Sequence, residues 1–158
     1  MISKKTFQKL LKNGLTIAFA ESMTGGLCAF EMIKNEGASN VIKGSLITYS
    51  DAQKIKWLDI KADEIKAHGV VSKEIAQQMA KQVRMLTDAH VGVSVTGYAS
   101  LKSQTETQRL EAFIGIETKD LTDVYHIHLE GFSRLQAIKK TVRFVYEKLD
   151  EILSKNTQ

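Results

Sequence analysis

The chain has 158 residues, 43% of them apolar, which is enough to build the core of one α/β domain without metals or disulfides. Its single cysteine, Cys28, excludes an intramolecular disulfide and a cysteine-based zinc site, and we expect it to pack in a helix. The net charge of +4 comes without an aromatic nucleic-acid motif, so nucleic-acid binding is not expected. No run approaches the roughly 20 apolar residues that cross a bilayer, and the lysine-rich amino terminus does not suit a signal peptide. The sequence therefore predicts a soluble, cytoplasmic protein with one domain over residues 1–158.

The first third of the chain alternates helix and strand signals. Apolar residues at helical spacing predict a helix over residues 3–12, which Asn13-Gly14 would end. The almost continuous apolar run over residues 15–20 is typical of a strand buried on both faces. A helix over 27–34 and a strand over 44–49 follow, and Ser50-Asp51 offers a cap for a helix over 52–58.

The rest of the chain continues the α/β pattern. Ser72 is a plausible cap for a long helix whose buried face would carry Ile75, Met79, Val83 and Leu86. A strand over residues 91–95 comes next, and two strands over 113–117 and 124–129 predict an antiparallel hairpin. Residues 98–111 show no regular pattern, and a helix over 134–153 closes the domain.

Three of the predicted strands end in polar or glycine residues. In open α/β sheets ligands bind beyond the carboxyl ends of the strands, so these residues predict one shared pocket. The glycines at 25 and 26 and the helix start behind them would offer backbone N–H groups to an anion or an oxyanion. A tight structural turn would need the same spacing, so the motif alone leaves both interpretations open. The strand ends are Glu21-Ser22, Tyr49-Ser50 and Thr96-Gly97.

Ser22, Tyr49 and Lys54 could together form a hydrolase site. A serine hydroxyl is a poor nucleophile until a base removes its proton, and a partly buried lysine with a lowered pKa can do so. The alternative is that Lys54 is an ordinary surface lysine, and Lys56 competes for the same role.

Histidine spacing does not indicate a metal site. Of the four histidines, His126 and His128 would lie on one face of a strand, but no third ligand accompanies them. Surface hydrogen bonds are the expected role for both. No metal is predicted.

Several segments form a pattern in a fixed order and almost without gaps. They are Ala20-Glu21-Ser22-Met23-Thr24-Gly25-Gly26, Gly37-Ala38-Ser39, Gly44 to Lys54 with Thr48-Tyr49-Ser50, Gly69-Val70-Val71-Ser72-Lys73-Glu74-Ile75-Ala76 and Met79-Ala80. This pattern resembles the CinA carboxy-terminal domain family over most of residues 15–97, and the resemblance resumes at 113–116 and 131–134. Active members of this family are nicotinamide mononucleotide deamidases.

The resemblance implies a three-layer α/β/α sandwich with a mixed, mostly parallel sheet, assembled as a homo-oligomer. It implies hydrolysis of nicotinamide mononucleotide to nicotinate mononucleotide and ammonia, within NAD recycling, with no cofactor. Ser22 would be the nucleophile, activated by Lys54 with Tyr49 as a proton relay, and Glu21 would organise the turn. Backbone N–H groups around Thr24 to Gly26 would stabilise the oxyanion. The implied substrate-binding residues are Glu21, Thr24, Gly25, Gly26, Thr96, Gly97 and Arg134.

One segment departs from the family pattern. Members usually follow the Thr-Gly pair with a glycine- and proline-rich loop, whereas residues 98–111 contain neither residue type. Side-chain charge from Lys102, Arg109 or Arg134 would have to replace backbone donors to phosphate. Because residues 103–106 resemble a capping box, we expect this loop to be mobile or partly helical without ligand. The departure keeps open an alternative function, a non-catalytic module that binds a nucleotide or a protein, although retained Ser22 and Lys54 favour an enzyme.

Overall fold

Five strands form one mixed sheet in the computed structural model, which describes residues 1–100 and 109–155. The order β2-β1-β3-β4-β5 places β1 (Ile17–Glu21) between β2 (Ile42–Ile47) and β3 (Val91–Tyr98), and both neighbours pair with it in parallel. The hairpin of β4 (Glu111–Glu117) and β5 (Thr122–His128) pairs antiparallel, with β4 also antiparallel to β3. Four strands thus run in one direction and β4 in the other, which confirms the predicted mixed sheet and hairpin.

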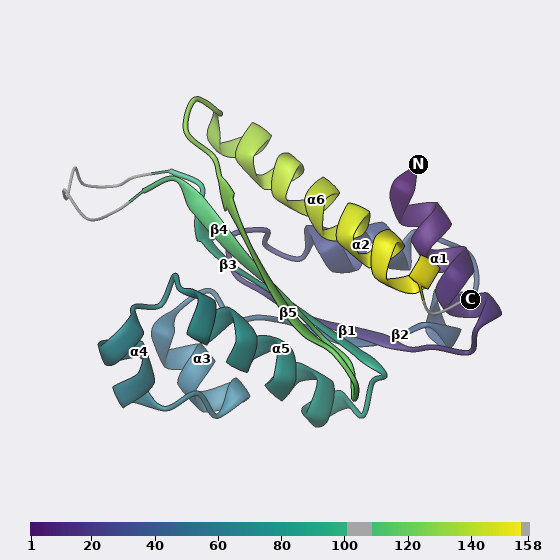
Figure 1. The fold of residues 1–158 in the computed structure, drawn as a ribbon, viewed down its shortest axis with the longest axis horizontal. Helices are drawn as coiled ribbons and strands as arrows, with labels where there is room; N and C mark the ends of the chain where they lie inside the picture. The colour runs from purple at the N-terminus through teal and green to yellow at the C-terminus, as the bar shows by residue number, and fades with distance from the viewer. Residues whose placement is uncertain (101–108, 156–158) are drawn as a thin grey trace.

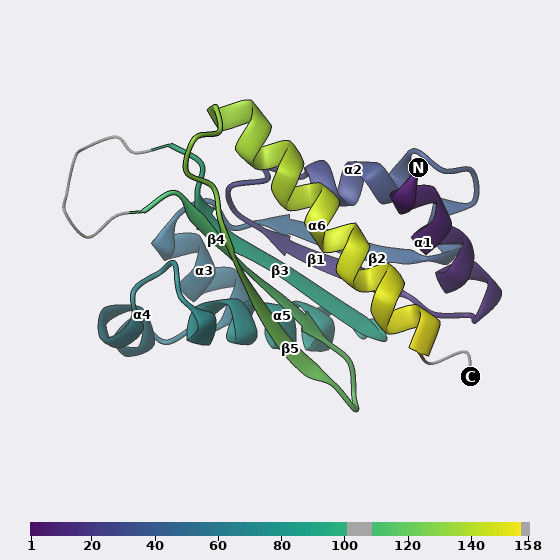
Figure 2. The ribbon, with the colours of Figure 1, turned by 45° about the horizontal axis from the view of Figure 1, so that its top comes forward.

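Helices cover both faces of the sheet (Figures 1 and 2). One layer contains α1 (Ile2–Lys12), α2 (Leu27–Ile33) and α6 (Arg134–Lys155), and the other contains α3 (Asp51–Leu58), α4 (Ala62–His68) and α5 (Lys73–Thr87). The predicted three-layer sandwich is therefore confirmed. The sequence analysis missed α4 and a short 3-10 turn at Ala38–Asn40, because neither is long enough to show apolar periodicity.

Strand β1 explains why its sequence is almost continuously apolar. Ile17 and Phe19 pack in the core beneath α1, α2 and α6, whereas Ala18 and Ala20 pack in the second core, against α5. Because side chains alternate along a strand, Glu21 points to the same side as Ile17 and Phe19. The strand thus directs the Glu21 side chain toward α2.

Two predicted boundaries need correction. The second strand ends at Ile47 rather than at residue 49, although the Thr48 N–H still donates to the Glu21 carbonyl at 2.9 Å. Tyr98 and Glu111 were predicted in the irregular segment, but they pair with each other across β3 and β4. The rest of that segment, including Lys102 and the capping-box-like residues 103–106, lies outside the described residues, so the expectation about its conformation stays a prediction.

The buried face of α5 also differs from the prediction at one position. Leu86 is 61% exposed, because the helix continues its inward face through Thr87 instead, whose Cγ2 lies next to Gly44 of β2. Cys28 is fully buried in α2, as the composition predicts.

Candidate active site

A pocket of about 350 Å³ lies at the carboxyl ends of β1 and β3 and beside the start of α3. The predicted convergence of strand ends is present, because residues that follow three different strands line this one pocket. Glu21, Thr24, Gly25 and Gly26 do not line it. The predicted site residues that do line it are Ser22, Tyr49, Lys54, Thr96, Gly97 and Arg134.

Glu21 fixes the turn that carries Ser22. Its carboxyl group is fully buried, and Oε1 accepts hydrogen bonds from the Thr24 hydroxyl at 2.7 Å and from the Cys28 N–H at 2.9 Å. Oε2 accepts from the Ala29 N–H at 3.0 Å. The N-cap residue of α2 is Gly26, which has no capping side chain. The Leu27 N–H donates to the Thr24 carbonyl, and Glu21 satisfies the next two helical N–H groups from the neighbouring strand. Ser22 is thereby held between a strand and a capped helix.

Backbone hydrogen bonds at this turn decide which donors remain for a ligand. The Gly25 N–H donates to the Ser22 carbonyl at 3.0 Å, so within this turn it is engaged with the backbone and is not free for an oxyanion. Gly25 and Gly26 have φ values of 58° and 96°, which favour glycine, and the Gly26 N–H has no protein partner in the described residues, so its predicted use stays a prediction. The N–H groups of Met23 and Thr24 have no protein partner in the described part of the chain, and Met23 lines the pocket.

Lys54, and not Lys56, lies beside the serine. The Lys54 side chain is 2% exposed, and its Nζ donates to the Thr48 carbonyl at 2.8 Å and lies 3.5 Å from Ser22 Oγ. Lys56 is exposed, since two residues along a helix turn a side chain to the opposite face. Burial lowers the pKa of Lys54, and the negative charge of Asp51 partly opposes this shift.

Tyr49 contacts Arg134 rather than the serine. Its hydroxyl accepts a hydrogen bond from Arg134 Nη2 at 2.7 Å, while Arg134 Nη1 donates to Ser100 Oγ at 2.7 Å. Within the described residues no hydrogen bond joins Tyr49 to Ser22 or Lys54. The proton-relay role of Tyr49 therefore stays a prediction, and its observed contact orients the guanidinium of Arg134.

Thr96 and Gly97 shape the floor of the pocket. The Thr96 hydroxyl donates to the Val70 carbonyl at 2.8 Å, which ties β3 to the segment before α5. A Cβ at position 97 would lie 2.6 Å from Met23 Sδ and 2.5 Å from the Glu111 carbonyl. Glycine at 97 therefore leaves room for the Met23 side chain that follows the candidate nucleophile.

Sequence reasoning missed several other lining residues. The sequence predicts only a helix-capping role for Asp51 and an irregular loop after Gly97. Burial raises the pKa of the Tyr98 hydroxyl, with further contributions from the charges of Asp51 and Glu111. Arg109 is exposed and does not line the pocket. The missed residues are Asp51, Val70, Val71, Tyr98, Ala99 and Ser100.

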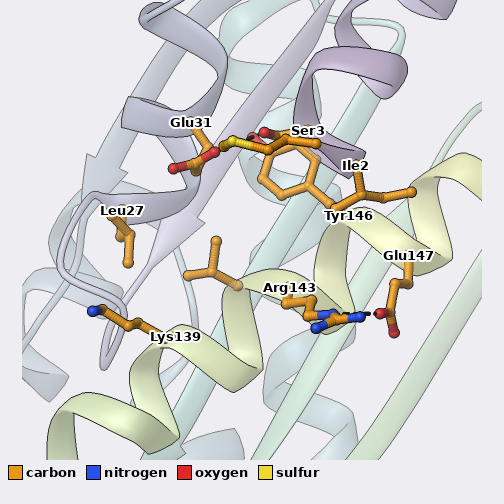
Figure 3. Close-up of a pocket in the computed structure, with 10 residues that line it drawn as sticks. Ile2, Ser3, Leu27, Glu31, Lys139, Arg143, Tyr146 and Glu147 are labelled. Carbon is orange, nitrogen blue, oxygen red and sulfur yellow. Dashed lines mark hydrogen bonds and ion pairs between the residues drawn. The ribbon is translucent and has the colours of Figure 1, made fainter.

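A histidine pair and a second pocket are two other features within residues 1–100 and 109–155. His126 and His128 lie side by side on β5, with ring centroids 4.6 Å apart, but the described residues hold no cluster of three or more side chains suited to a metal. A second pocket of about 580 Å³ lies between α1, α2 and α6 (Figure 3). Its serine, Ser3, donates to Glu31 at 2.7 Å, so that hydroxyl faces a carboxyl acceptor and not a lysine amine.

In residues 1–100 and 109–155 no helix is long and apolar enough to cross a membrane.

The fold and this pocket define an α/β/α-sandwich domain with a candidate serine–lysine centre. The chain belongs to the CinA C-terminal domain family, because the family profile matches residues 1–153. Its resemblance in sequence is thus confirmed over almost the whole length.

Relatives and solved structures agree with this membership. Proteins from Streptococcus equi subsp. zooepidemicus and Streptococcus pyogenes serotype M1, provisionally named as competence-damage inducible proteins, are 40% identical over 134 residues, or 85% of this chain. The chain spans about a third of their length, 32% in each case. A CinA superfamily protein from Klebsiella pneumoniae superposes with a TM-score of 0.92 at 21% identity, over 98% of this chain and 96% of that one. The competence/damage inducible protein CihA from Agrobacterium tumefaciens gives a TM-score of 0.88 at 25% identity, over 97% and 93% of the two chains.

The buried contacts of Glu21 predict a large effect of a small substitution. Glu21→Gln replaces an acceptor oxygen with an amide NH₂ that faces N–H and O–H donors, so we expect a loss of about 1–3 kcal/mol in the free energy of unfolding. Urea denaturation measures it. Glu36→Gln is the matched control, because Glu36 is exposed and has no hydrogen bond or ion pair in the described residues. Equal stability of the two variants would contradict the role given to Glu21.

Proposed function

We propose that this chain hydrolyses the carboxamide of nicotinamide mononucleotide, giving nicotinate mononucleotide and ammonia. The observation that carries the proposal is the buried Lys54 amine, 3.5 Å from Ser22 Oγ, inside a pocket. The chain belongs to the CinA C-terminal domain family. The proposed substrate comes from the sequence resemblance, because active members of this family are nicotinamide mononucleotide deamidases. Neither a metal nor a cofactor enters the proposed reaction.

The proposed reaction begins with proton transfer from Ser22 to neutral Lys54. Ser22 Oγ attacks the carboxamide carbon while Lys54 Nζ takes the hydroxyl proton, and the tetrahedral intermediate then collapses as the lysine ammonium protonates the leaving amine. Ammonia departs and an ester remains on Ser22. Water, deprotonated by Lys54, hydrolyses this ester and frees the serine. A separation of 3.5 Å is compatible with this role, because such hydrogen bonds often tighten only when substrate binds.

The turn after Ser22 supports the negative charge that develops on the carboxamide oxygen. The Met23 N–H follows the nucleophile directly, has no protein partner in the described residues, and belongs to a residue that lines the pocket. One such donor typically contributes about 3–4 kcal/mol to transition-state stabilisation. We assign the oxyanion contact to Met23, with Thr24 and Gly26 as the other N–H groups of the turn that have no protein partner in the described residues.

Arg134 is the proposed contact for the phosphate. It lines the pocket from the first turn of α6, and two hydroxyl groups, those of Tyr49 and Ser100, hold its guanidinium. Guanidinium groups bind phosphate oxygens through two parallel hydrogen bonds. A side chain thus takes the role that glycine-rich backbone serves elsewhere in the family.

A non-catalytic nucleotide- or protein-binding module is the second candidate function. The absence of glycine from residues 98–111 favours it, since the loop beside the pocket departs from the family pattern. The two functions differ in whether ammonia is released. Assembly into a homo-oligomer is a separate expectation that comes only from the family resemblance.

Substitutions at the two central residues test the proposed function. We expect Ser22→Ala to lower amidase activity by at least about 10³-fold, because it removes the nucleophile, and Lys54→Ala to lower it by about 10²–10⁴-fold. Lys56→Ala is the matched control and keeps its activity, since Lys56 points away from the pocket. Ammonia release from nicotinamide mononucleotide is the assay, with circular dichroism to verify folding. Activity that survives in Ser22→Ala would remove serine from the mechanism.

If Arg134 contacts the phosphate, the binding affinity of the ligand should depend on its phosphate group and on salt concentration. Nicotinamide riboside, which lacks the phosphate, should bind more weakly than the mononucleotide, and Arg134→Gln should weaken binding of the mononucleotide alone by about tenfold. Added salt should reduce the difference, because it screens exposed charges. Calorimetry at two salt concentrations measures these affinities, and Arg109→Gln, outside the pocket, is the control. Equal affinity of the wild-type protein for the two compounds would refute phosphate recognition here.

A further inference from the structure

Asp51 is a pocket residue to which the proposed reaction gives no role. It is the first residue of α3, directly after the cap Ser50, whose hydroxyl accepts from the Gln53 N–H at 3.3 Å. Its side chain is exposed and lines the same pocket as Ser22 and Lys54. No ion pair or hydrogen bond neutralises the Asp51 carboxylate within the described part of the chain.

The negative charge of Asp51 acts on side chains from two elements. It opposes the effect of burial on the pKa of Lys54, which belongs to α3, and it helps to raise the pKa of Tyr98, at the end of β3. Both side chains also line the pocket. The Asp51 carboxylate thus lines the same pocket as the two groups whose pKa values it shifts.

Arg134 brings the opposite charge to the same pocket. Its guanidinium is held by Tyr49 and Ser100, whereas the Asp51 carboxylate has no hydrogen bond or ion pair in the described residues. Two tyrosine rings, Tyr49 and Tyr98, line the pocket as well, and aromatic faces attract cations. A ligand with a cationic ring and an anionic phosphate would match this distribution of charge.

We propose that Asp51 is a specificity-determining residue that selects a substrate whose aromatic ring carries a permanent positive charge. The inference rests on the proposed function, in which the ring is the pyridinium of nicotinamide mononucleotide. A carboxylate in the pocket attracts this ring and also offsets the repulsion that a cationic ring would meet near Arg134. The reduced dihydropyridine form has the same carboxamide, ribose and phosphate but a neutral ring, so Asp51 gives it no comparable attraction.

Binding of the two ring forms tests this inference directly. The Ser22→Ala substitution prevents turnover. Calorimetry then measures the affinity of Ser22→Ala and of Ser22→Ala with Asp51→Asn for nicotinamide mononucleotide and for its reduced form. We expect Asp51→Asn to weaken binding of the cationic form by about three- to tenfold and to leave the neutral form within about twofold, as for one partly screened charge pair. Asp51→Glu, which keeps the charge, should retain the preference.

Two controls separate a direct attraction from other effects. Asp59→Asn removes one negative charge from the other end of α3, outside the pocket, and should change neither affinity. Repeating the comparison in a Lys54→Met background removes any effect that passes through the charge of Lys54. Loss of the preference for the cationic ring on Asp51→Asn in both backgrounds supports the inference.

The failure of the inference differs from the failure of the proposed function. If the wild-type protein releases ammonia from nicotinamide mononucleotide, but Asp51→Asn affects both ring forms equally or neither of them, the inference alone is overturned. If the wild-type protein neither binds nor hydrolyses the mononucleotide, the proposed function and the inference fall together.

Discussion

The buried Lys54 amine beside Ser22 is the interaction on which the candidate site depends. Moving a lysine out of water favours its neutral form, and only the neutral amine can accept the proton of a serine hydroxyl. The Thr48 carbonyl, at 2.8 Å, gives the amine a hydrogen-bond acceptor that fixes its position. The burial that lowers the pKa of Lys54 is thus also what suits this lysine to act as a base.

The fold brings these two residues together through the register of neighbouring elements. Strand alternation along β1 sends Glu21 to the α2 side, where it accepts from backbone N–H groups of that helix and holds the turn that begins at Ser22. The parallel neighbour β2 leads directly into α3, whose first turns place Lys54 against Ser22. The same topology carries Thr96 and Gly97 to the pocket from β3.

Much of this arrangement could be predicted from the sequence, because its signals are local. Apolar runs and caps predicted most helices and strands, and the resemblance to the CinA C-terminal domain family pointed to Ser22 and Lys54. Whether Lys54 or Lys56 is buried depends on how α3 is rotated against the sheet, which needs the tertiary structure. The same holds for the Gly25 N–H, whose bond to Ser22 follows from the turn geometry. Residues that act across the pocket, such as Asp51, Tyr98 and Ser100, carry no local signal at all.

The pH dependence of kcat/KM for ammonia release from nicotinamide mononucleotide tests the central claim most directly. This profile reports groups of the free enzyme, and only deprotonated Lys54 can act as the base, so activity should rise with pH through the pKa of Lys54. Burial lowers this pKa, and the charge of Asp51 opposes the shift only in part. The midpoint of the rise should therefore lie at a pH below the ordinary lysine pKa of 10.5. Lys54→Met should abolish this limb together with the activity. A wild-type rate that is independent of pH, or the same rising limb in Lys54→Met, would contradict the central claim.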